Sequence, residues 1–204
     1  LALDRPRDAL AAYERAAADA PNLAVAWAGV GRAREALGDV PRAGVAWNRA
    51  VDRAPDDPAL RTGRGGFRLR AGNFAGALAD FDAARRRSPD DPALDFNRGL
   101  ALAALERDAE AEQAFTRVLR RDPGDAAAWL NRARLRASRD RDAALSDFSA
   151  AVDRAPGWAT PRFERGVLLD AIGRDAEADE DYRRAWELGL RNEFLTERML
   201  EMGE

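Results

Sequence analysis

The sequence predicts an all-α solenoid, in which antiparallel helix pairs stack on one another along the chain. A proline returns at nearly constant spacing, after 34, 34, 34 and 33 residues, at Pro21, Pro55, Pro89, Pro123 and Pro156. A fixed period of this length indicates stacked repeats. Within each period a small, an aromatic and a second small residue follow one another at helical spacing: Ala9/Tyr13/Ala16, Ala43/Trp47/Ala50, Ala77/Phe81/Ala84, Ala111/Phe115/Val118, Ala144/Phe148/Ala151 and Ala178/Tyr182/Ala185.

The period divides the chain into units of one helix pair each. The expected order is a half repeat (1–21), five full repeats (about 22–55, 56–89, 90–123, 124–156 and 157–190) and a capping helix (about 191–204). A stacked repeat protein buries its core as a continuous seam between neighbouring units. The 204 residues, of which 46% are hydrophobic, are therefore expected to form one elongated domain over 1–204.

The half repeat and the first full repeat have clear helix boundaries. The half repeat contains one helix, at about 6–19, which has no preceding partner helix in this sequence. The first helix of the next unit is expected at about 24–37 and to end at Gly38, because glycine favours helix termination. Pro41 falls in the first turn of the following helix, where a missing N–H has no cost.

The later helices also begin at recognisable residues. Asp57-Pro58 and Asp91-Pro92 predict helix starts, because aspartate caps a helix and proline suits its first position. We expect Thr160 to cap the last pair and Pro161 to open it. The fifth pair is one residue short, within the turn at 138–141. The final helix, at about 192–202, has one apolar stripe, formed by Phe194, Leu195, Met199 and Leu200.

Packing accounts for the residue types that recur. Small residues at equivalent positions allow the two helices of a pair to approach closely, and aromatic side chains fill the space between one pair and the next. We therefore assign the aromatics to the core. The glycine cluster at 63–66 lies within a helix, where glycine lowers stability by roughly 1 kcal/mol per residue relative to alanine. The repeat that contains this cluster, about 56–89, is therefore expected to be the least stable. The small residues are Gly31, Gly65, Gly99, Ala133 and Gly166; the aromatics are Trp47, Phe81, Phe115 and Phe148.

These landmarks resemble those of the tetratricopeptide repeat (TPR) family over nearly the whole chain. The resemblance implies a right-handed solenoid of antiparallel helix pairs with a C-terminal capping helix. It also implies a docking surface rather than an enzyme, and a concave face, lined by the first helices of the pairs, that holds a peptide. Members of the family act in unrelated processes, so the resemblance leaves the pathway open.

Composition excludes most catalytic and metal chemistry. The chain contains no His and no Cys, and all 33 of its basic residues are Arg. It therefore lacks a Ser-His or Cys-His pair, a His or Cys metal ligand and a lysine for Schiff-base or phosphate-loop chemistry. We expect no enzymatic activity, no cofactor and no metal site. The acidic pairs 56–57 and 90–91 are interpreted as helix caps rather than cation ligands.

Two arginine runs, at 85–87 and 120–121, raise the question of nucleic-acid binding. Both are expected in the last turn of a helix, where positive charge is favoured by the helix dipole. The net charge of −3 also disfavours a phosphate-binding surface. We therefore expect no nucleic-acid partner. A membrane span is not expected either, because no run of about 18 apolar residues is present.

The resemblance places the candidate binding residues on the concave face. Asn97 and Asn131 are equivalent in adjacent repeats and form a ladder suited to the N–H and C=O groups of a bound peptide. An apolar strip accompanies them, and positive charge beside both favours a segment with some acidic character. The alternative is that the asparagines cap or bond a neighbouring helix and that Phe96 packs inward. The strip comprises Phe96, Leu130 and Phe163; the charged residues are Arg32, Arg70, Arg134 and Glu164.

The favoured function is a protein–protein interaction scaffold or adaptor that binds a peptide segment in this groove. The alternative is a regulatory or targeting segment of a larger enzyme or transcription regulator whose active domain is absent from this chain. The expected partner is a protein or peptide, with self-association through the open face around Tyr13 also considered. The compartment stays open: the cytoplasm is slightly favoured, and a periplasmic or membrane-anchored parent protein is an alternative.

Overall fold

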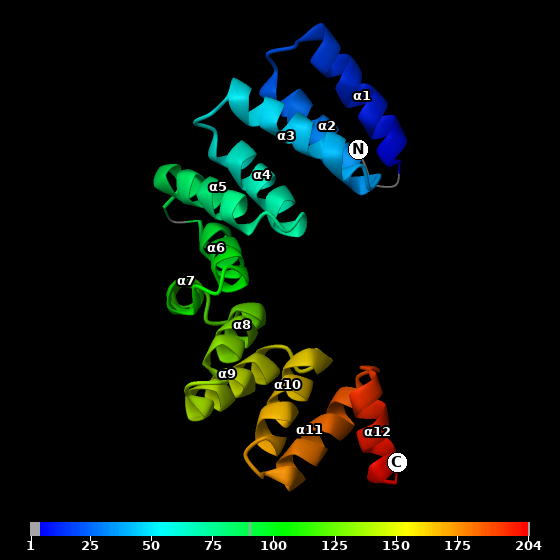
Figure 1. Ribbon diagram of the computed structural model, residues 1–204, viewed down its shortest axis with the longest axis vertical. Coiled ribbons are helices and arrows are strands. Elements are labelled where there is room, and N and C mark those ends of the chain that lie inside the picture. Colours follow the sequence, from blue (N-terminus) through cyan, green and yellow to red (C-terminus); the bar gives the residue numbers. More distant parts are fainter. Residues whose placement is uncertain (1–4, 90, 204) are drawn as a thin grey trace. The chain divides into compact units, whose positions relative to one another are not determined.

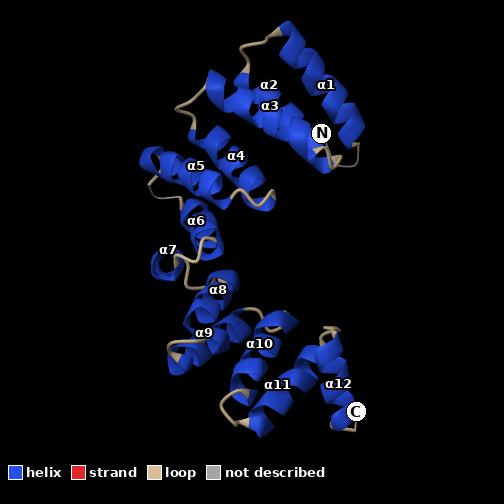
Figure 2. Cartoon of the chain, in the orientation of Figure 1, coloured by secondary structure: helices blue, strands red, loops and turns tan. Residues whose placement is uncertain are grey.

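The computed structural model describes residues 5–89 and 91–203. These residues form twelve α-helices and no strand (Figure 2). The all-α class predicted from the sequence is confirmed. The chain divides into two compact units, Leu1–Arg107 and Asp108–Glu204, which are described one at a time. The prediction of a single domain over 1–204 stays a prediction.

The first unit contains six helices (Figure 1): α1 (Pro6–Asp19), α2 (Ala24–Ala36), α3 (Val40–Arg53), α4 (Pro58–Arg70), α5 (Phe74–Arg87) and α6 (Pro92–Ala104). Each helix packs on the next along the chain, and the extensive α2–α3 and α4–α5 contacts form the predicted pairs. The alternate helices α2 and α4 also touch, as do α4 and α6. The first helices of successive pairs therefore share a surface.

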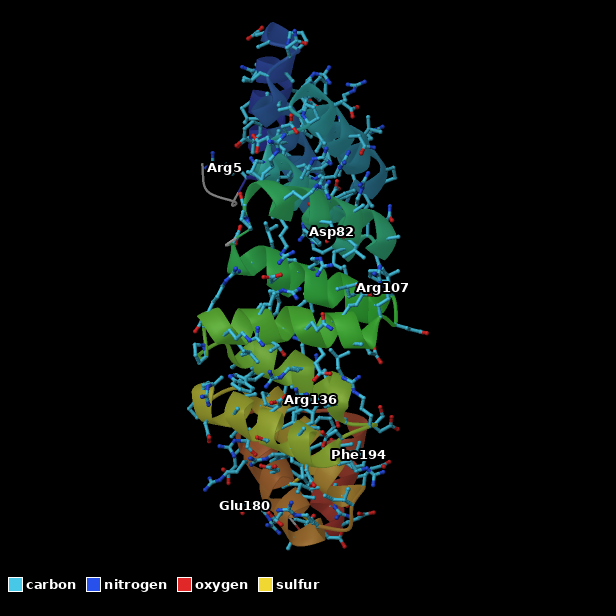
Figure 3. All side chains as sticks on the ribbon, turned by 90° about the vertical axis from the view of Figure 1, so that its left-hand side faces the viewer. Arg5, Asp82, Arg107, Arg136, Glu180 and Phe194 are labelled. Carbon is cyan, nitrogen blue, oxygen red and sulfur yellow. The ribbon has the colours of Figure 1, made fainter. Side chains whose placement is uncertain are left out.

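The second unit contains the other six helices: α7 (Asp108–Arg121), α8 (Ala126–Arg136), α9 (Arg141–Arg154), α10 (Ala159–Asp170), α11 (Asp175–Glu187) and α12 (Glu193–Glu201). Here α8–α9 and α10–α11 are the pairs, and α12 packs on α11. Of the apolar stripe predicted on α12, Leu195 and Met199 are buried, whereas Phe194 (labelled in Figure 3) and Leu200 are exposed. The Phe194 ring centroid nevertheless lies 5.4 Å from that of the buried Tyr182, so three of the four stripe residues contact the core of the unit.

The helices begin largely where local chemistry predicts. The Asp57 carboxylate accepts hydrogen bonds from the backbone N–H groups of Ala59 (2.8 Å) and Leu60 (3.2 Å), as expected of a cap. Asp91 caps α6 in the same way, whereas Asp90 lies outside the described residues. The prediction that Thr160 caps α10 is wrong. This helix begins at Ala159, because Pro161 is tolerated anywhere in the first turn, where no N–H is needed.

The recurrent aromatics are the centre of the core, as predicted. Phe81 and Phe115 are fully buried, and Trp47 and Phe148 are at most 3% exposed. Glycines make room for them: a Cβ atom added at Gly63 would lie 2.5 Å from the Trp47 ring. Within the described part of the chain, no helix has the length and apolar character needed to cross a membrane.

Candidate functional site

Four of the predicted groove residues come together in the second unit. On α8, Arg134 donates a hydrogen bond from Nε to Glu164 Oε2 on α10 (2.7 Å) and a second one from Nη2 to Oε1. Its third nitrogen, Nη1, lies 3.4 Å from Asn131 Oδ1. The hydrogen bonds to Glu164 raise the pKa of the Arg134 guanidinium above its ordinary value, against the opposing effect of burial. Phe163 lies beside Glu164 on α10. These hydrogen bonds link α8 and α10, which are the first helices of two successive pairs.

A similar link is present in the first unit. Arg70 on α4 donates from Nε to Glu35 Oε1 on α2 at 2.5 Å. Arg32, also on α2, is exposed, and its guanidinium carbon lies 6.0 Å from the centroid of the Trp47 ring. No carboxylate of the described residues pairs with Arg32. Arg32 therefore carries a positive charge without a carboxylate partner among the described residues, whereas the charge of Arg70 is balanced by that of Glu35.

The side-chain amide nitrogens of the two asparagines are bonded to their own helices. Asn97 Nδ2 donates to the carbonyl of Ala93 on its own helix (2.9 Å), and Asn131 Nδ2 donates to that of Ala127 (2.8 Å). Both donors thus bond to their own helix, and not to a neighbouring helix as in the alternative. Asn131 Oδ1 also accepts from Arg134 Nη1 at 3.4 Å and keeps a lone pair for a further donor, and both residues are only half-buried. Each asparagine can accept a hydrogen bond from a bound backbone N–H.

The predicted apolar strip is not a continuous surface. Leu130 is 1% exposed and packs with Phe148 and Leu168 in the core, so its assignment to the surface is wrong. Phe163 is half-buried, with its ring centroid 6.1 Å from that of Tyr182. Phe96 is also half-buried. The direction of Leu130 follows from its place on α8, where it faces the aromatic residue of the paired helix α9.

The structure also shows a set of arginines that the predictions overlooked. They recur with the period, and each forms an ion pair with a buried aspartate of the following helix. In the second unit, Arg132 Nε and Nη2 each donate to the Asp147 carboxylate at 2.8 Å. Its Nη1 donates to Thr116 on the preceding helix at 3.1 Å. The same arrangement joins Arg64 to Asp80 and Arg165 to Asp181.

Each of these Arg–Asp pairs connects three consecutive helices. Asp80, Asp147 and Asp181 are at most 3% exposed, so their charges are balanced inside the protein rather than by water. Arg98 differs in that it pairs with Asp82 on the preceding helix, and Asp82 is labelled in Figure 3. The sequence itself contains the pattern that indicates this set: Arg64, Arg98, Arg132 and Arg165 follow one another after 34, 34 and 33 residues. The arrangement is typical of a structural role.

The remaining charged features also have structural partners. In the arginine run of α5, Arg85 pairs with Asp95 and Arg87 with Asp56. Among the described residues, no group of His, Cys, Asp and Glu side chains has the geometry to hold a metal ion. The surface chemistry of the candidate site is therefore that of hydrogen bonds and ion pairs.

Comparisons with known proteins agree with this architecture. A family profile described as "Tetratricopeptide repeat" matches residues 1–58, 68–126 and 109–139. No curated protein matches the chain significantly in sequence. Among solved structures, the chain is similar to YrrB, described as a TPR protein with an unusual peptide-binding site. The TM-score is 0.71 at 19% identity, over 93% of this chain and 98% of that one.

Two further solved structures show the same fold. MamA from Desulfovibrio magneticus RS-1 matches with a TM-score of 0.74 at 17% identity, over 81% of this chain and 94% of that chain. A thermophilic TPR protein from Thermus thermophilus matches with a TM-score of 0.65 at 23% identity, over 84% and 94%. Likeness at this level of identity concerns the fold alone. Because the family profile covers more than half of the sequence, the chain belongs to the tetratricopeptide repeat family.

Proposed function

We propose that this protein is an adaptor that binds extended segments of a partner protein on the surfaces that the first helices of the pairs form within each of its two units. Membership of the repeat family supports a protein-interaction scaffold in general. The observation that carries the finer proposal is the side-chain oxygen of Asn131. It is held at the surface beside the Arg134–Glu164 bridge, while the amide nitrogen is anchored to the helix. Such an acceptor suits the N–H of an extended chain.

The charges on this surface define the segment that fits. Arg70 and Arg134 each form an ion pair with a glutamate. The net charge of each pair is zero, so neither arginine acts as a free cation. Arg32 is exposed and has no carboxylate partner among the described residues. In the first unit a preference for acidic side chains therefore rests on Arg32, and in the second unit the surface beside Asn131 binds the peptide backbone. The peptide-binding site mentioned for YrrB is consistent with this class of ligand.

The test uses a peptide selected against the chain from a random display library. Losing one hydrogen-bonding side chain costs about 0.5–1.5 kcal/mol of affinity. The double variant Asn97→Ala/Asn131→Ala is therefore expected to weaken binding severalfold or more, measured by titration calorimetry. Its helicity and melting temperature are expected to stay close to those of the wild type, because both asparagines are half-exposed.

The matched control is Gln113→Ala, which removes an exposed amide side chain from the second-type helix α7. It should leave the affinity unchanged. Equal affinity of the wild type and the double variant for a selected peptide would refute the proposed site.

A further inference from the structure

The first full repeat lacks the Arg–Asp pair that repeats 56–89, 124–156 and 157–190 carry; repeat 90–123 keeps Arg98 but has Ala114 in place of the aspartate. At the position of Arg64, Arg132 and Arg165 the first full repeat has Val30, and at the position of their aspartates it has Ala46. A hollow of about 400 Å³ lies at this place between α1, α2 and α3. We call it the seam pocket. Its apolar lining comprises Ala17, Pro21, Trp27, Val30, Val45 and Ala46.

The equivalent place in the second unit shows what the substitutions change. There a hollow of about 290 Å³ between α9, α10 and α11 has a mainly polar lining, which includes Arg162, Arg165, Glu177, Glu180 and Asp181, with Leu145 and Leu169 as its apolar part. The Arg165–Asp181 pair, with hydrogen bonds of 2.7 and 2.8 Å, occupies its wall. An apolar ligand would have to bury these charges, which is unfavourable. Only the first of the two hollows is suited to an apolar group.

The rim of the seam pocket is positively charged. Its polar lining consists of Arg34, Arg42, Arg49 and Glu14. Arg34 pairs with Glu14 at 2.7 Å and Arg42 with Asp39 at 3.2 Å, which leaves Arg49 as the net positive charge at the mouth. The Arg42 side chain is 73% exposed even though it pairs with Asp39. The whole protein has a net charge of −3. The charge at the rim of the pocket therefore has the opposite sign to that of the protein as a whole.

The pocket wall is rigid. Trp27 Nε1 donates to the carbonyl of Pro21 at 2.9 Å, and the guanidinium carbons of Arg49 and Arg53 lie 4.6 and 5.2 Å from the centroid of its ring. The ring is therefore held in place before anything binds. Preorganisation of this kind lowers the entropic cost of association. Beside the pocket, Val45 is 53% exposed, so apolar surface continues from the wall to the outside.

The seam pocket lies on the opposite side of α2 from the proposed binding surface. Trp27, Val30 and Arg34 are spaced by three and four residues, so they share one side of the helix. Arg32 follows Trp27 by five residues, which at about 100° per residue places it roughly 140° around the helix. The seam pocket is thus a separate surface.

We infer that the seam pocket binds an acidic segment of a partner protein through one apolar side chain of leucine or phenylalanine size. The apolar wall selects the anchor, and the excess of arginine at the rim selects aspartate and glutamate on either side of it. Pockets of about 300–1,000 Å³ with a mainly apolar lining and a few polar groups are typical of ligand sites. Two partner segments can then occupy opposite sides of the first repeat.

The test uses a fluorescent synthetic peptide in which one phenylalanine is flanked on both sides by aspartate and glutamate. We expect saturable binding to the full chain by fluorescence anisotropy. Replacing the phenylalanine by serine, or the acids by asparagine and glutamine, should weaken binding at least tenfold. In a ¹H–¹⁵N spectrum the indole signal of Trp27 should shift. The indole of Trp129, which makes the equivalent bond to Pro123 at 2.9 Å, is the internal control and should not.

The decisive variant installs the ion pair of the next repeat. Val30→Arg/Ala46→Asp copies the Arg64–Asp80 pair that the next repeat already accommodates, and it is expected to fold and to bind the peptide at least tenfold more weakly. A second variant, Arg42→Glu/Arg49→Glu, changes two exposed side chains, one of which lies over the Trp27 ring, and should reverse the preference to a basic peptide with the same phenylalanine.

Two results would overturn the inference. One is the absence of wild-type binding at millimolar peptide. The other is undiminished binding by both variants. Asn97→Ala/Asn131→Ala should leave the affinity for this peptide unchanged, so failure here is distinguishable from failure of the proposed peptide surface.

Discussion

At the scale of single residues, arginine acts mainly as a structural residue in this protein. The planar guanidinium can donate two parallel hydrogen bonds to one carboxylate and a third to another helix, which an ammonium group cannot do in the same geometry. Arg64, Arg132 and Arg165 all use this capacity. Recurrence of arginine at these positions is therefore a packing requirement, and it offers no argument for nucleic-acid binding.

A substitution of Arg132 by lysine tests this interpretation. Arg132→Lys keeps the charge and loses the bidentate bond to Asp147, a carboxylate that is 2% exposed, and the bond to Thr116. Arg136 Nη1 still donates to Asp147 Oδ2 at 3.0 Å, so the substitution leaves the buried Oδ1 without its donor, which costs about 1–3 kcal/mol. We expect a decrease of that size in the free energy of unfolding, measured with urea. The control is Arg184→Lys, at an exposed pair with Glu187, which should have no measurable effect. A loss as large in the control as in Arg132→Lys would contradict the interpretation.

The residue scale is also where the sequence was least informative about the candidate site. The period predicted that Trp47 and Phe81 are buried, because a large apolar group at helical spacing almost always packs. It did not predict the direction of Leu130. A one-residue step turns a side chain by about 100°, which separates the core from the surface. Ion partners such as Glu35 for Arg70 come from different repeats, and spacing alone does not identify them.

At the scale of a helix, the glycines of α4 are explained by the aromatic residues that they face. The sequence indicated that the cluster at 63–66 weakens its helix, which holds for isolated helices. In the structure, a Cβ atom at Gly63 would lie 2.5 Å from Trp47 and one at Gly65 would lie 2.7 Å from Phe81. A Cβ at Gly66 would meet only the Arg70 side chain, at 3.5 Å. Two of the glycines are required for packing, and Gly66 is not.

Substitution by alanine should therefore change stability in opposite directions at Gly63 and Gly66. Gly63→Ala forces a methyl group into the rigid Trp47 ring, and overpacking of this kind costs about 1–3 kcal/mol. Gly66→Ala meets ordinary van der Waals distances and should gain up to about 1 kcal/mol of helix propensity. Thermal unfolding followed by circular dichroism measures both. The packing argument fails if Gly63→Ala is as stable as Gly66→Ala.

At the scale of the whole molecule, the sequence predicted the fold well because the repeat supplies the same information several times. The helices α1 and α2 begin where the pattern placed them, at Pro6 and Ala24, and the caps at Asp57 and Asp91 follow simple local rules. The division into two compact units was not predicted. Local patterning specifies helices and neighbouring contacts, whereas compactness depends on how contacts accumulate over many helices.

The seam pocket was not predicted from the sequence either. Its signal is a departure from the repeat, Val30 and Ala46 in place of arginine and aspartate, and such a departure has meaning only once the Arg–Asp pairs are known. The same repeat supplies Arg32 to the proposed peptide surface on the other side of α2. The first unit thus has two candidate binding surfaces on opposite sides of α2, one that includes Arg32 and binds an extended peptide, and one that binds an apolar side chain flanked by acidic residues.

We predict that the two surfaces bind independently. The library-selected segment should lose affinity only in Asn97→Ala/Asn131→Ala, and the acidic phenylalanine peptide only in Val30→Arg/Ala46→Asp. Calorimetric titration of one peptide into protein saturated with the other should give the affinity measured alone, to within about twofold, because separate sites without a shared conformational change have no coupling free energy. A change of fivefold or more would show that α2 transmits binding between its two sides. Direct competition would mean that both peptides use the same surface, contrary to the opposite placement of Arg32 and Trp27 on the helix.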